Sequence, residues 1–139
     1  MNEIKLTYRG VIYSKKNSKK IITNRRTRKP IIISNRNAKS QEDAMAWMFR
    51  DQAMVEGWPT LHDPDFNHQY RVEIEIWQKN YVRRDLDNQA TAILDGLVAS
   101  GVLPDDRCDI VPELSVKFMG VDKNDPRAEI RITEVAWEI

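Results

Sequence analysis

Cysteine and long apolar runs are scarce in this sequence. Cys108 is the single cysteine, so an internal disulfide and a cysteine-based zinc cluster are excluded, and we expect a free thiol. No apolar run approaches the roughly 20 residues that a membrane-spanning helix requires. The first residues, Met1-Asn2-Glu3, lack the charged and then apolar pattern of a secretion signal. We therefore expect a cytoplasmic protein of a reducing compartment.

Acidic residues are missing from the whole stretch between Ile4 and Gln41. That stretch holds 12 Lys and Arg residues, whereas residues 42–139 hold 20 acids and 10 bases, so the net charge of +1 hides a segregated distribution. A basic block of this density repels itself unless a polyanion neutralises it. We predict that it binds the DNA backbone, with a solvated loop as the alternative. The predicted DNA contacts are Lys15, Lys16, Lys19, Lys20, Arg25, Arg26, Arg28, Lys29, Arg83 and Arg84.

The hydrophobic pattern predicts a single α+β domain over residues 1–139. The length fits one core, and 41% apolar residues are enough to build it. Apolar and polar residues alternate as in half-buried strands, and two stretches have the spacing of helices. We expect a mixed β-sheet with two main helices. The predicted strands are 4–8, 31–33, 70–76, 114–118 and 128–132, and the predicted helices are 41–56 and 88–100.

Local signals predict where the two helices begin and end. Ser40 and Asp43 have the spacing of a capping box, which predicts a helix start at Gln41. Gly101 is expected to end the second helix. Gly96 lies inside that helix, where it indicates either a close backbone approach or a tolerated imperfection.

Two acidic pairs are candidate metal ligands. Asp85 and Asp87 are two residues apart, and in an extended segment both side chains point to the same side. Neighbouring carboxylates repel unless a cation lies between them, and carboxylates are hard ligands of the kind that Mg²⁺ or Mn²⁺ prefers. Asp105 and Asp106 follow the intervening helix, which is about 20 Å long. They reach the first pair only if a returning strand or a partner chain brings them there. The alternative is a helix cap with solvated acids.

The run RDLDNQATAILDGLVASGVLPDDRCDI, residues 84–110, resembles the signature of the RusA family of Holliday-junction resolvases, common in phages and prophages. The basic run SKKNSKK resembles the Lys- and Arg-rich start of that family more loosely. Matching positions are Asp85, Asp87, Asn88, Asp95, Gly96, Leu97, Gly101, Asp105 and Asp106.

The resemblance implies a RusA-like fold and a homodimer that cuts four-way DNA junctions in a bacterial host with Mg²⁺ or Mn²⁺. It implies paired symmetric nicks during recombination or repair, with no small-molecule cofactor and no membrane. The implied catalytic and metal-binding residues are Asp85, Asp87 and Asp106. Supporting positions around them are Asn88, Asp95 and Asp105.

One position departs from the family pattern. Thr91 stands where the family usually has a functional Lys. Either a neighbouring cation replaces that Lys, or the protein is a weakly active or non-catalytic binder of branched DNA. A nuclease for other branched DNA or for RNA is a third reading. The four tryptophans, Trp47, Trp58, Trp77 and Trp137, are expected in the core or at an interface. Trp58, beside Gly57 and Pro59, is the one expected to be exposed, and stacking on unpaired bases is an alternative role for it.

Overall fold

A computed structural model describes residues 3–13, 19–23, 26–28, 30–34, 36–58 and 68–135. The described residues confirm an α+β arrangement with a mixed sheet and two helices. No described helix is long and apolar enough to cross a membrane. The elements in chain order are β1 (Glu3–Arg9), β2 (Lys19–Thr23), β3 (Pro30–Ser34), α1 (Arg36–Val55), β4 (Gln69–Gln78), α2 (Leu86–Ser100), β5 (Glu113–Val121) and β6 (Arg127–Val135).

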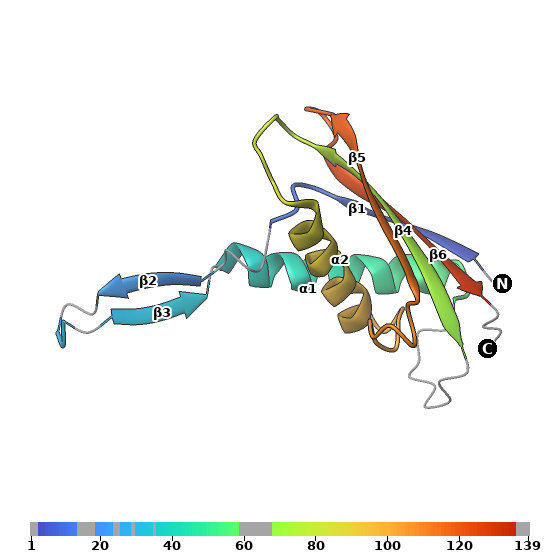
Figure 1. Ribbon diagram of the computed structural model, residues 1–139, viewed down its shortest axis with the longest axis horizontal. Coiled ribbons are helices and arrows are strands. Elements are labelled where there is room, and N and C mark those ends of the chain that lie inside the picture. Colours follow the sequence, from blue (N-terminus) through green and yellow to red (C-terminus); the bar gives the residue numbers. More distant parts are fainter. Residues whose placement is uncertain are drawn as a thin grey trace.

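The main sheet has the strand order β1-β6-β4-β5. Strands β4 and β5 are parallel, because α2 carries the chain back between them, and the other pairs are antiparallel. Both helices lie on one face of this sheet (Figure 1). The alternation expected in β4 is confirmed, since Val72, Ile74 and Ile76 are buried. The core therefore lies between the sheet and the helix pair.

The two helices approach each other closely at Gly96. A Cβ atom at this position would lie 2.8 Å from the Cβ of Met45 and 3.4 Å from a ring carbon of Phe49. Of the two interpretations of Gly96, the close backbone approach is the one found, and it is made to α1 of the same chain. The absence of a side chain at Gly96 thus allows α2 to pack closely against α1.

Both helices begin earlier than the sequence predicts. Helix α1 begins at Arg36, so Ser40 and Asp43 lie inside it and the expected capping box is wrong. Arg36, Ala38 and Lys39 are good helix formers, so their helix propensity favours a helix that begins before Gln41. Residues 19–34 contain an antiparallel hairpin of β2 and β3, which projects beyond the start of α1 (Figure 1). The predicted strand after Pro30 is confirmed as β3.

Candidate functional site

The first acidic pair lies at the start of α2. Asp85 is the N-cap residue with an extended backbone, and the helix begins at Leu86. Asp87 therefore lies in the first helical turn, so the expectation that residues 85–87 are extended is wrong for Asp87. A negative charge there is favoured by the partial positive charge of the helix N-terminus. The Asp85 side chain makes no capping hydrogen bond, so capping does not account for its carboxylate.

Asn88 links the two carboxylates of this pair. Its side-chain amide donates a hydrogen bond to Asp85 Oδ2 at 3.3 Å, and its backbone N–H donates to Asp87 Oδ1 at 2.9 Å. Both aspartates are exposed. Asn88 thus donates a hydrogen bond to one oxygen of each of the two exposed carboxylates.

Thr91 lies one helical turn after Asp87. Its hydroxyl donates a hydrogen bond to the Asp87 carbonyl oxygen at 2.9 Å, so the side chain folds back on its own helix. Thr91 is exposed and carries no charge. The cations nearest in the chain to the acidic pair are Arg83 and Arg84, which directly precede it.

The second acidic pair follows α2 in the loop before β5. Asp105 accepts a hydrogen bond from the Asp106 backbone N–H at 2.7 Å. Burial raises the pKa of Asp106, and the hydrogen bond and charge of Asp105, followed by the charge of Asp95, raise this pKa further. Asp106 is therefore electrostatically coupled to Asp95 and Asp105, and its ionised form is disfavoured by its neighbours.

The two acidic pairs lie toward opposite ends of α2 (Figure 1). Asp85 and Asp87 are at its N-terminus, whereas the loop with Asp106 follows its C-terminus. Within the part of the chain that the structure describes, no three His, Cys, Asp or Glu side chains form a group able to hold a metal ion. One chain therefore brings Asp85 and Asp87 together but does not add Asp106 to them.

Two buried glutamines attach Ile12 and Tyr13 to the helices. These two residues come shortly before residues 15–39, the basic segment. The Gln41 side chain bonds both the N–H and the C=O of Tyr13, and the Gln89 amide donates to the Ile12 carbonyl. The Arg84 guanidinium lies 5.6 Å from the centre of the Tyr13 ring. These contacts hold Ile12 and Tyr13 against the N-terminal parts of both helices. Because the bonded residues are far apart in the chain, no local sequence pattern predicts these contacts.

The structure describes the predicted DNA contacts unevenly. Arg26, Arg28 and Arg83 are exposed, and Arg84 is half-buried. Lys19 and Lys20 belong to β2, for which the structure describes only the backbone. Four predicted contacts lie outside the described residues, namely Lys15, Lys16, Arg25 and Lys29.

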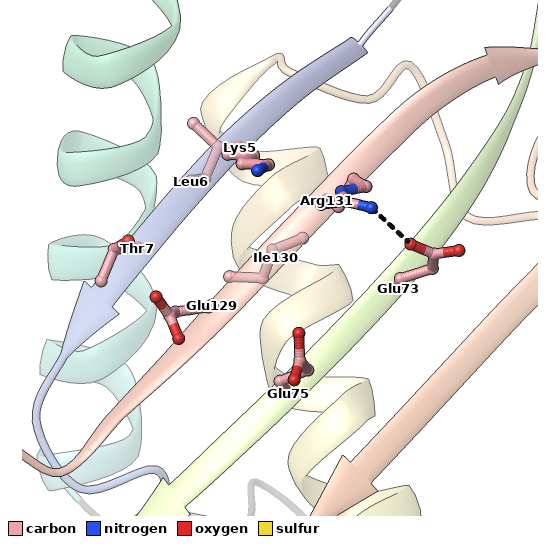
Figure 2. Close-up of a pocket in the computed structure, with 8 residues that line it drawn as sticks. All are labelled: Lys5, Leu6, Thr7, Glu73, Glu75, Glu129, Ile130 and Arg131. Atoms are coloured by element: carbon pink, nitrogen blue, oxygen red, sulfur yellow. Dashed lines mark ion pairs between the residues drawn. The ribbon is translucent and has the colours of Figure 1, made fainter. Parts of the chain in front are cut away.

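The sheet face that carries no helix has charges of both signs. Figure 2 shows a shallow pocket on it where Glu75 and Glu129 lie near each other. Arg131 bonds Glu3 at 3.0 Å and lies 3.9 Å from Glu73. Paired charges of this kind give no net attraction for a polyanion, so this face is a poor DNA-binding surface.

The family model of the endodeoxyribonuclease RusA matches residues 10–133 of the 139-residue chain. The match spans both acidic pairs, both helices and the whole basic segment of residues 15–39. The chain therefore belongs to the RusA endodeoxyribonuclease family. No curated protein matches it.

Proposed function

We propose that this protein is a metal-dependent endonuclease that resolves four-way (Holliday) DNA junctions by paired symmetric nicks. The observation that carries the proposal is the pair of exposed carboxylates, Asp85 and Asp87, each of which accepts a hydrogen bond from Asn88. Family membership supports cleavage of DNA. Arg83 and Arg84 directly precede the acids, and Arg84 lies over Tyr13, two residues before the basic segment begins in the sequence, which supports the hydrolysis of a bound phosphodiester.

The donor set fits a hard divalent cation such as Mg²⁺, with Mn²⁺ as a substitute. Asp85, Asp87 and Asp106 would supply carboxylate oxygens, which such ions prefer. When bound, the ion supplies an activated water and neutralises charge on the phosphate.

We propose that Asp106 reaches the first acidic pair from a second copy of the chain. The distribution of the acids supports this, since one chain places Asp106 toward the far end of α2. The charges that raise the pKa of Asp106 come from Asp105 and Asp95, and no three acids among the described residues form a group able to hold a metal ion. A two-fold dimer exchanges the loops symmetrically and offers two equal sites for the two strands of a junction.

The basic residues of the chain hold the DNA against this acidic centre. Arg83 and Arg84 precede Asp85 and are placed to bond phosphate oxygens with their guanidinium groups. The basic segment neutralises further phosphates. If it contacts about 6–10 of them, affinity falls about 10³- to 10⁵-fold between 50 and 200 mM salt.

A synthetic four-way junction tests the proposal. The wild-type protein is expected to make two symmetric nicks in Mg²⁺ and none in EDTA. Asp85→Asn is expected to slow cutting at least about a hundredfold while binding is kept or tightened, because one negative charge is lost. Asp109→Asn, in an exposed acid of the loop after α2, is the matched control. Cutting by Asp85→Asn at the wild-type rate would contradict the proposal.

Mixed dimers test the contribution of the second chain. A dimer of one Asp85→Asn chain and one Asp106→Asn chain contains one intact site if the acids come from different chains. It is then expected to nick one strand, although each variant alone is inactive. If the acids of one site come from a single chain, the mixed dimer has no intact site and cuts neither strand.

A non-catalytic junction-binding protein is the second candidate function. Thr91 favours it, because its neutral hydroxyl is bonded to the Asp87 carbonyl and offers no positive charge to a phosphate. The same assay separates the two functions. Retarded but uncut junctions in every divalent metal would favour the binding protein.

A further inference from the structure

An exposed apolar hollow lies directly before the first acidic pair. It has a volume of about 310 Å³, and its lining includes Tyr81, Val82, Leu86 and Phe118 together with Arg83 and Arg84. The loop that carries most of these residues leaves β4 at the end of the sheet where the parallel strand β5 also ends (Figure 1). The hollow is therefore within a few residues of Asp85 along the chain.

The apolar side chains of this hollow are unusually exposed. The Tyr81 residue is 85% exposed and Phe118 is 43% exposed. Phe118 is paired with buried Ile76 but lies on the edge strand β5, which contacts α2 only sparsely. Apolar side chains gathered at a polar surface are typical of a binding site.

The occupant must suit both aromatic rings and guanidinium groups. Arg83 and Arg84 would leave unpaired charges under a purely apolar partner surface, whereas a nucleotide has a π-face for the rings and a phosphate for the arginines. We propose that the hollow receives an unpaired nucleobase at the branch point of the DNA. The base stacks on Tyr81 and Phe118 while the arginines bond its phosphate. This inference rests on the proposed junction-cutting function.

Trp58 is buried, contrary to the expectation that it is the exposed tryptophan, and its burial excludes the alternative in which it stacks on bases. It is 5% exposed, and its indole N–H donates a hydrogen bond to the Val102 carbonyl at 3.1 Å. Tyr81 is an exposed aromatic residue four positions before Asp85 in the chain. A base at a branch point leaves its stack more easily than a base within a duplex, so the hollow selects junctions over duplex DNA.

Tyr81→Ala measures the stacking contribution with little effect on the fold, because the side chain is exposed. Binding is measured in EDTA, where no cleavage occurs, on a four-way junction with 2-aminopurine at the branch point and on an uninterrupted duplex. We expect Tyr81→Ala to weaken junction binding by about 5- to 150-fold, with duplex binding unchanged. The aminopurine fluorescence quenched by the wild type is expected to recover, and Tyr81→Phe is expected to bind like the wild type.

Trp47→Ala is the matched control, since Trp47 is 71% exposed on α1 and does not line the hollow. If Tyr81→Ala weakens binding no more than Trp47→Ala, the inference is overturned while the junction-cutting proposal stands. If the wild type binds junction and duplex equally, the proposed function itself fails. If Tyr81→Ala dissociates a dimer in sedimentation, the hollow is covered by a second copy, and the inference is overturned.

Discussion

The side-chain amide of Gln41 bonds both backbone polar groups of Tyr13. Its Oε1 accepts from the Tyr13 N–H at 2.7 Å, and its Nε2 donates to the Tyr13 carbonyl at 2.9 Å. Gln41 is buried on α1, so the chain leaves β1 in a direction set by the helix. Gln52 makes the same pair of bonds to Thr7, at 2.8 and 2.7 Å, farther from the basic segment.

Gln41→Ala and Gln52→Ala distinguish the contribution of these bonds to stability from their contribution to DNA binding. Each variant loses two hydrogen bonds to the backbone, which we expect to lower the free energy of unfolding by about 1–3 kcal/mol in urea titrations. Gln41→Ala alone is expected to weaken junction binding, by roughly 3- to 10-fold, because it frees the start of the basic segment. Fluorescence anisotropy measures the binding. Equal weakening by Gln52→Ala would show that the effect is general loss of stability.

The sequence predicts those parts of the molecule that depend on local pattern. Alternation identified β4 and β6, and apolar spacing identified α2, because burial of one face follows directly from residue order. The start of α1 was misjudged because Ser40 and Asp43 match a cap that helix propensity overrides. Gln41 and Tyr13 are 28 residues apart, and bonds of this kind leave no periodic trace. Likewise, sequence spacing found both acidic pairs but not their separation in space.

Gly96→Ala tests the contact between the helices. Helix propensity alone favours Ala by about 1 kcal/mol. The added Cβ would meet the Cβ of Met45 at 2.8 Å, however, and such overpacking costs about 1–3 kcal/mol. We expect a net loss of up to about 2 kcal/mol in the free energy of unfolding. Ala99→Gly, at an exposed site of α2, measures the effect of helix propensity alone on the free energy of unfolding. A stabilised Gly96→Ala variant would contradict the close approach.

Glu75 and Glu129 are directly opposite each other in the β4–β6 pair and are drawn together in Figure 2. Like charges in this position repel. Glu75→Gln is expected to raise the free energy of unfolding by about 0.2–1 kcal/mol, with a smaller gain at high salt. Glu73→Gln is the control, because Glu73 lies 3.4 Å from Arg71 and its loss removes an attraction. Thermal melts at two salt concentrations measure both variants, and stabilisation by both would refute the pairwise explanation.

The raised pKa of Asp106 predicts the direction in which the stability of the fold changes with pH. Its pKa is raised in the folded chain by burial and by the neighbouring acids, so the folded state binds this proton more tightly than the unfolded state. Its contribution to stability is present below the ordinary pKa of 3.8 and is lost as the pH rises through the raised value. In EDTA, Asp106→Asn should therefore melt at a higher temperature than the wild type at pH 7, and this difference should vanish toward pH 4. A constant difference across this range would contradict the shift.

Thr91→Lys tests the departure from the family pattern. Position 91 is exposed one turn after Asp87, so a lysine there can extend toward a phosphate bound at the acidic pair. We expect the rate of junction cutting in Mg²⁺ to rise by at least about tenfold, since a positioned cation stabilises charge that develops on the phosphate. Single-turnover assays at saturating protein separate this gain from tighter binding.

Thr91→Met provides the matched control, because it removes the hydroxyl and adds length without charge. If Thr91→Lys raises affinity but leaves the single-turnover rate unchanged, the cation acts on binding alone, and Arg83 or Arg84 already serves the reacting phosphate. If Met and Lys accelerate cutting equally, release of the bond to the Asp87 carbonyl explains the gain. A rise seen only with Lys would establish that the lack of a positive charge at position 91 limits the cutting rate of the wild type.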